Sequence, residues 1–136
     1  MADVLLISAQ QNLDTIGLKY IHQYLIENGF DSLLLYIPNF TKQKGSDRLH
    51  LEKFLREVNP PIVGISLTVE DYPVACEVTK IIKKVLPNTS VIWGGIEPTT
   101  EPERCLQHAD FVCMGEGEIP LREAVEVMKK GGDLKI

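Results

Sequence analysis

Five short apolar runs that alternate with five helical patterns restrict the fold of this chain more than any other feature of its sequence. The runs cover residues 4–8, 32–36, 62–66, 90–93 and 111–114. Each run is apolar at nearly every position, as expected of a strand that is buried on both faces. Regular alternation of such strands with helices is typical of βαβ units around a parallel sheet. We therefore expect an α/β domain with helices on both faces of its sheet.

Amphipathic stripes mark the helices between these runs. Apolar residues recur at helical spacings from Leu18, Leu51, Val74 and Leu121 onward, and a shorter helix is expected at residues 101–107. Right-handed crossovers then favour the doubly wound, flavodoxin-like strand order 2-1-3-4-5 for the parallel sheet. The 136 residues, of which 44% are hydrophobic, suit a single domain over residues 1–136, because no linker-like segment divides the pattern.

The charge and the cysteine content disfavour several classes of protein. Fourteen Lys and Arg residues against nineteen Asp and Glu residues give a net charge of −5, which would repel nucleic acid and anionic membrane surfaces. Three cysteines without CxxC spacing indicate neither a disulfide framework nor a zinc or iron–sulfur site, and they fit a reducing, cytoplasmic environment. No apolar stretch approaches the roughly 18 residues of a membrane span.

Ligands of doubly wound sheets bind at the carboxyl ends of the strands. The loops expected there are residues 9–14, 67–72, 94–100 and 115–118, whereas loop 37–48 is longer, polar and expected to be mobile. Neither a GxGxxG dinucleotide fingerprint nor a GxxxxGK[ST] phosphate loop occurs. Asp14 is the only acid placed as in a phospho-receiver domain, so that function is disfavoured as well.

Three features of these loops could contact a ligand, and each has a simpler structural explanation. Ser66 and Thr68 could donate to a ligand over the edge of the sheet, or Ser66 could satisfy a neighbouring backbone group. Gly94 and Gly95 permit close approach of a ligand, or they form a tight turn. Residues 115–120 are typical of a helix start, because acids and a proline suit the first helical turn.

The histidines and two of the cysteines suggest no catalytic site. His22, His50 and His108 are expected on partly exposed surfaces and not in the cleft. Cys76 is expected to be an exposed thiol, because it falls opposite the apolar stripe of its helix, and Cys113 is expected in the core. The sequence therefore indicates a binding domain without a catalytic constellation of its own.

Two strand-end motifs resemble the cobalamin (vitamin B12)-binding domain at the amino end of cobalamin-dependent radical SAM enzymes. The first is VIWGGIEPT at residues 91–99, followed by PE at 102–103, and the second is ADFVCMGEGE at residues 109–118. VLLIS at residues 4–8 and PPIVGIS at residues 60–66 fit the same pattern. The resemblance therefore covers nearly the whole chain, and it implies cobalamin as the cofactor of this domain.

One departure from the wider cobalamin-binding family concerns the lower ligand of cobalt. A DxHxxG motif after the first strand of that family supplies a histidine that replaces the cofactor's own base. The corresponding residues here are Asn12, Asp14 and Gly17, so that Asp14 occupies the histidine position. The resemblance therefore implies no imidazole ligand from this position and no protein ligand to the metal, a departure that is common in the radical SAM branch.

The resemblance also implies the position of the cofactor and the residues that contact it. The corrin ring is expected over the carboxyl ends of the strands, with its nucleotide tail in the cleft beside the first and fourth strands. The corresponding residues are Asp14, Gly17, Ser66, Leu67, Thr68, Gly94, Gly95, Gly115, Glu116 and Gly117. Gln10, Gln11 and Asn12 are expected, from their chemistry and position, to hydrogen-bond the corrin amides or the tail. A bulky substitution at Gly94 or Gly95 is expected to obstruct the tail without unfolding the domain.

The resemblance further implies a radical SAM domain as a partner in the same parent chain. That domain would bind S-adenosylmethionine and an iron–sulfur cluster through CxxxCxxC, a motif absent from these 136 residues. We therefore expect residues 1–136 to be one domain of a longer, methyltransferase-like enzyme. Two alternatives stay open: a stand-alone corrinoid carrier of methyl groups, and a flavodoxin-like interaction or signalling domain without a ligand.

Overall fold

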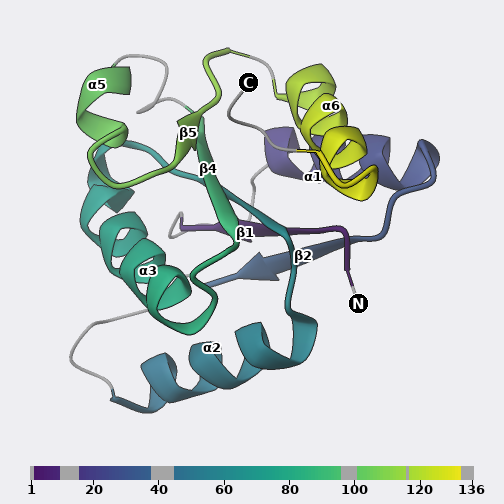
Figure 1. Ribbon diagram of the computed structural model, residues 1–136. Helices are drawn as coiled ribbons and strands as arrows, with labels where there is room; N and C mark the ends of the chain where they lie inside the picture. Colours follow the sequence, from purple (N-terminus) through teal and green to yellow (C-terminus); the bar gives the residue numbers. More distant parts are fainter. Residues whose placement is uncertain (1, 10–15, 38–44, 96–100, 116, 133–136) are drawn as a thin grey trace.

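The structure, a computed structural model, describes residues 2–9, 16–37, 45–95, 101–115 and 117–132. Within these residues the chain forms a five-stranded parallel sheet of order β2-β1-β3-β4-β5 (Figure 1). The strands are β1 (Val4–Ser8), β2 (Ser32–Tyr36), β3 (Ile62–Ser66), β4 (Ser90–Gly94) and β5 (Phe111–Val112). The predicted flavodoxin-like order is confirmed.

Helices cover both faces of the sheet, as the sequence predicts (Figure 1). One face carries α1 (Ile16–Glu27) and α6 (Glu118–Lys129), which pack against each other. The other face carries α2 (Gly45–Val58), α3 (Tyr72–Val85) and the short α5 (Pro102–Cys105), and a 3-10 turn, η1 (Val69–Asp71), precedes α3. The carboxyl ends of the strands lie between these two layers of helices.

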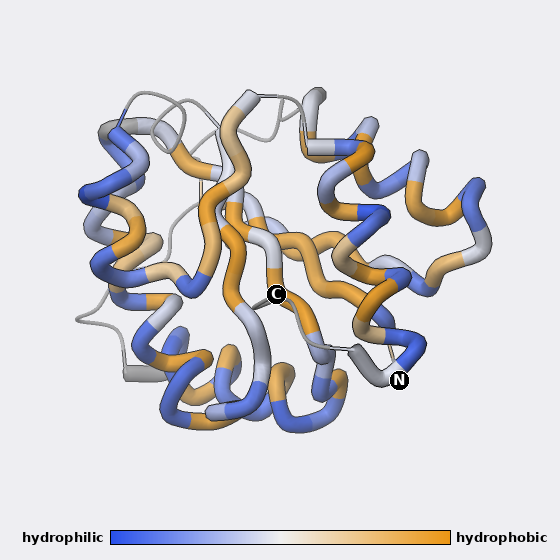
Figure 2. Tube along the Cα trace, turned by 45° about the horizontal axis from the view of Figure 1, so that its top comes forward, coloured by the Kyte–Doolittle hydropathy of each residue, from blue (hydrophilic) through white to orange (hydrophobic). Residues whose placement is uncertain are grey.

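Two apolar clusters, one on each face, hold the helices on the sheet. Side chains alternate along a strand, so that Leu5 and Ile7 of β1 belong to the cluster under α2 and α3, and Val4 and Leu6 belong to the cluster under α1 and α6. Figure 2 shows the resulting pattern, with hydrophobic strands at the centre and helices along which hydrophobic and hydrophilic residues alternate. The continuous apolar runs of the sequence are thus explained by burial on both faces.

Trp93 of β4 anchors the short helix α5 and the segment that follows it. The Trp93 ring is fully buried and stacks on His108, with ring centroids 5.9 Å apart and an angle of 10° between the planes. Its Nε1–H donates to the Thr79 hydroxyl on α3 at 2.9 Å. The Tyr72 ring meets both rings edge-on, and the Arg104 guanidinium lies 3.7 Å from the centre of the Tyr72 ring.

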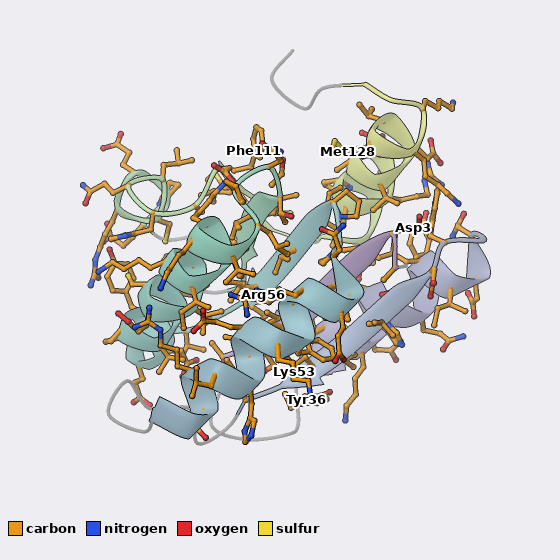
Figure 3. All side chains as sticks on the ribbon, turned by 60° about the horizontal axis from the view of Figure 1, so that its bottom comes forward. Asp3, Tyr36, Lys53, Arg56, Phe111 and Met128 are labelled. Carbon is orange, nitrogen blue, oxygen red and sulfur yellow. The ribbon has the colours of Figure 1, made fainter. Side chains whose placement is uncertain are left out.

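Three local expectations differ from the structure. Loop 37–48 is shorter than expected, because α2 already begins at Gly45 and carries exposed polar residues, including Lys53 and Arg56, on its outer side (Figure 3). β5 ends at Val112 and not at residue 114, because only Phe111 and Val112 pair with β4 before the chain turns at Gly115, whose φ is +80°. The helix expected at 101–107 is regular only over Pro102–Cys105 and ends in turns.

Candidate functional site: a glycine-lined cavity at the carboxyl ends of the strands

A cavity of about 530 Å³ lies between α1, α6 and the face of the sheet beneath them. Its size is within the roughly 300–1,000 Å³ of small-molecule pockets. Residues of β3, β4 and β5 line it up to their carboxyl ends, and the loops after β4 and β5 contribute to its edge. The cavity therefore occupies the position at which parallel doubly wound sheets bind ligands.

Small residues on the sheet create the space for this cavity. Two rows of aligned residues cross the strands on the α1/α6 side: Leu6, Gly64 and Ile92 in one row, and Ser8, Ser66 and Gly94 in the next. A Cβ atom at Gly64 would come within 3.0 Å of Leu6 Cδ2, so that this position is filled by its neighbours. The outer row has only small side chains and leaves the cavity open toward the carboxyl ends.

Glycines from every part of the site surround the cavity. They are Gly17, Gly64, Gly94, Gly95, Gly115 and Gly117. All except Gly64 were expected at the site from the sequence, and the structure brings these five together from three separate segments. Gly64 was missed as a site residue, although a glycine in the middle of an apolar strand is a signal for close approach of another group.

Gly94 and Gly95 have different roles despite their adjacency. A Cβ at Gly94 would meet Cys113 Cβ at 3.8 Å, an ordinary contact. Gly95 has a φ of +108°, and a Cβ there would lie 2.8 Å from the Leu67 carbonyl oxygen. The expectation that a bulky residue at Gly95 leaves the fold intact is therefore wrong, because the backbone itself requires glycine at that position.

The segment after β3 divides between the cavity and the core. Ser66 lines the cavity, whereas the Leu67 side chain is fully buried in the cluster on the opposite face of the sheet. Thr68 does not line the cavity; its backbone N–H and its hydroxyl both donate to Asp71 Oδ2, at 3.0 and 2.8 Å. Asp71, only 4% exposed, thus fixes the conformation of this turn, a role the sequence reasoning missed.

Cys113 and Glu118 give the cavity its ionisable groups among the described residues that line it. Burial raises the pKa of the Cys113 thiol, and the nearby Glu118 carboxylate raises it further. Cys113 is therefore a neutral thiol at physiological pH. The expectation of a core position holds in part, because Cys113 is half-buried against the α1/α6 cluster but also borders the cavity.

The other predicted side chains lie elsewhere. Residues 10–12, 14 and 116, which include Gln10, Gln11, Asn12, Asp14 and Glu116, are outside the described residues. None of the three histidines lines the cavity: His50 is exposed on α2, and His22 and His108 are half-buried. Cys76 is not the exposed thiol expected, because it packs against the α2/α3 cluster, and its burial raises its pKa.

Neither a metal site nor a membrane span is found in the part of the chain that the structure describes. No three His, Cys, Asp or Glu side chains among the described residues approach one another closely enough to hold a metal ion. No described helix has the length and apolar character to cross a membrane. The cavity is thus the strongest candidate for a functional site.

A match to a known family identifies the class of this domain. The sequence model of the B12 binding domain family matches residues 2–125. The chain belongs to this family. The matched range includes β1 to β5 and all of the segments that line the cavity, so the cavity lies within the part of the chain that matches the family.

Two curated relatives of this B12 binding domain are much longer proteins. An uncharacterized methyltransferase of Pyrococcus horikoshii is 35% identical over 88 residues, which are 62% of this chain and 19% of the relative. The anaerobic magnesium-protoporphyrin IX monomethyl ester cyclase of Synechocystis is 26% identical over 132 residues, which are 92% of this chain and 25% of the relative. The chain thus spans a fifth to a quarter of the length of these relatives.

Solved structures support the fold. The radical S-adenosylmethionine methyltransferase TsrM of Kitasatospora setae, with cobalamin and a [4Fe-4S] cluster bound, superposes with a TM-score of 0.80 at 20% identity, over 98% of this chain and 28% of that protein. The cobalamin-dependent radical enzyme OxsB, with aqua-cobalamin bound, gives a TM-score of 0.74 at 22% identity, over 98% of this chain and 20% of that protein. This B12 binding domain therefore has the fold of domains found in such enzymes.

Proposed function

We propose that this domain binds cobalamin and holds its nucleotide tail in the cavity between α1, α6 and the sheet. The observation that carries the proposal is the glycine-lined cavity at the carboxyl ends of the strands in a member of the B12 binding domain family. A bulky aromatic group with a sugar linker needs a deep space whose walls do not project, and the small residues Ser66 and Gly94 of the outer row line such a space.

The described residues fit such a cofactor in both shape and polarity. Gly17 and Gly94 line the cavity and leave space into which side chains would otherwise project. Ser66 lines the cavity at the end of β3 and brings a hydroxyl to it, and Gly115 and Gly117 lie at its edge beyond β5. Residues 10–12 and 14 belong to the proposed contacts as well, through the amide side chains of Gln10, Gln11 and Asn12.

The chemistry would take place above the carboxyl ends of the strands. When bound, cobalamin supplies a cobalt centre that carries a methyl group or accepts electrons. The domain's own residues bind and orient the cofactor and keep water from its tail, and the reaction on a substrate requires an adjoining radical SAM domain with S-adenosylmethionine and an iron–sulfur cluster. The long relatives, of which this chain spans a fifth to a quarter, support a parent protein of that kind.

A spectral titration of the chain with hydroxocobalamin tests the proposal. We expect saturable binding with the spectral shift of the base-off form, because the tail in the cavity cannot also coordinate cobalt. Gly94→Val should weaken binding at least about tenfold, since its two methyl groups would enter the cavity. The variant should still fold, because β-branched residues suit a strand.

A matched control uses the same strand and the same side of the sheet. Ser90→Val lies at the other end of β4 and outside this cavity, so it should bind hydroxocobalamin as the unchanged protein does. Loss of binding in both variants, or in neither, would contradict the proposed position of the tail. Absence of any binding to the folded chain would instead favour an interaction domain without a ligand.

A further inference from the structure

We propose that the cavity selects cobamides whose lower base is a benzimidazole over those whose lower base is adenine. The inference rests on the proposed function, because it concerns the base at the end of the nucleotide tail. The inference adds a preference for one class of lower base, and this preference comes from the apolar inner end of the cavity, which we call its floor.

The floor of the cavity offers no hydrogen-bonding side chain among the described residues. Leu6 and Ile92 from the sheet and Leu121 from α6 form it, and they are 0%, 8% and 7% exposed. The backbone beneath is already paired, since Gly64 of β3 is aligned with Leu6 on one side and with Ile92 on the other. A polar atom that reached this floor would lose its water and gain no partner from these residues.

The polar groups of the described lining lie toward the open end. Ser66 is the last residue of β3, and Glu118 is the first residue of α6, one helical turn before Leu121. The Cys113 thiol is also at the carboxyl end, directly after β5. The described lining is therefore polar at its mouth and apolar at its floor.

The two classes of base differ at the edge that such a floor would contact. The outer edge of dimethylbenzimidazole carries two methyl groups and no hydrogen-bonding atom. The corresponding edge of adenine carries an amino group and ring nitrogens, which are solvated in water and would be buried without partners. We expect the adenine form to bind at least about tenfold more weakly, because it would bury several polar groups without partners and each costs roughly fivefold or more in affinity.

The test compares three corrinoids on the same protein by spectral titration. Hydroxocobalamin carries dimethylbenzimidazole, adeninylcobamide carries adenine, and cobinamide has neither base nor nucleotide. We expect hydroxocobalamin to bind best and adeninylcobamide at least about tenfold more weakly. Cobinamide should also bind more weakly than hydroxocobalamin, because it leaves the apolar floor uncovered.

Two substitutions at one position of α6 separate polarity from size. Ala124 is half-buried and lines the cavity three residues after Leu121, on the same side of the helix. Ala124→Ser adds a hydroxyl and should narrow the difference between the adenine and benzimidazole forms. Ala124→Val adds only volume and should weaken both forms alike.

The outcomes distinguish failure of this inference from failure of the proposed function. Equal affinity for hydroxocobalamin and cobinamide would mean that no base occupies the cavity; it would overturn the inference and the proposed position of the tail, while binding of the corrin ring stands. A difference of less than about tenfold between the adenine and benzimidazole forms would overturn the selectivity alone. If none of the three corrinoids binds the folded chain, the proposed function fails and the inference fails with it.

Discussion

Gly94 and Gly95 are adjacent in the sequence but should respond in opposite ways to alanine. At Gly95 the methyl group would lie 2.8 Å from the Leu67 carbonyl oxygen and 3.3 Å from the Leu67 nitrogen, at a φ of +108°. The Leu67 N–H donates to the Gly94 carbonyl at 3.1 Å, so that the two segments cannot separate without loss of this bond. At Gly94 the methyl group would meet Cys113 Cβ at 3.8 Å, which requires no movement.

These contacts set the expected magnitudes. Backbone strain of this kind costs about 1–3 kcal/mol, and with the steric overlap we expect Gly95→Ala to lower the free energy of unfolding by roughly 2–4 kcal/mol. Gly94→Ala should raise the free energy of unfolding by at most about 1 kcal/mol, because alanine loses less backbone entropy than glycine when it is fixed in a strand. At roughly 3–5 °C per kcal/mol, Gly95→Ala should lower the melting temperature by about 6–20 °C.

Thermal and urea unfolding followed by circular dichroism measure this difference. Both variants and the unchanged protein are compared without cobalamin, because a bound ligand would stabilise the folded state by itself. The reasoning is refuted if Gly95→Ala melts within about 2 °C of the unchanged protein, or if the two variants lose similar stability.

Two further predictions concern Trp93 and Cys113. Trp93→Phe removes the Nε1–H donor to Thr79 and the stacking on His108, so we expect a loss of about 2–4 kcal/mol in urea unfolding; a loss below about 0.5 kcal/mol would contradict the structural role of this ring. The raised pKa of the Cys113 thiol leaves less thiolate than in a free cysteine at the same pH. Iodoacetamide at pH 8 should therefore modify Cys113 more slowly than a cysteine in an unfolded peptide. Mass spectrometry of the Cys113 peptide measures the rate. Hydroxocobalamin should slow the reaction further, and an unprotected Cys113 would count against a ligand in the cavity.

The arrangement of secondary structure was largely predictable, because it depends on local patterns. The bounds of β1, β2 and β3 agree with the apolar runs of the sequence, since strands packed between layers of helices are mostly apolar, here with a serine only at one end. The start of α2 was placed too late, because residues 45–48 have the sequence GSDR and give no apolar signal. The early end of β5 reflects where its pairing with β4 stops, which no local pattern encodes.

The candidate site was predictable only in its outline. The general rule that ligands bind at the carboxyl ends of parallel strands pointed to Ser66, Gly94 and Gly115, and all three line the cavity. Gly64 and Leu121 were missed, because a mid-strand glycine and a core leucine become cavity residues only when α6 covers that side of the sheet. The different demands on Gly94 and Gly95 depend on how closely the Leu67 backbone approaches one of them.

The sequence by itself determined the alternation of strands and helices, the crossover topology that follows from it, and the edge of the sheet where a ligand can bind. These properties depend on residue type and on spacing along the chain, which burial and chain chirality convert into a fold. Only the tertiary structure decided which helices enclose the cavity, how the rows beginning at Leu6 and Ser8 align across three strands, and that the floor is apolar while the mouth is polar. Each of these depends on distances between segments that are remote in sequence, and packing fixes such distances only when the whole core has formed.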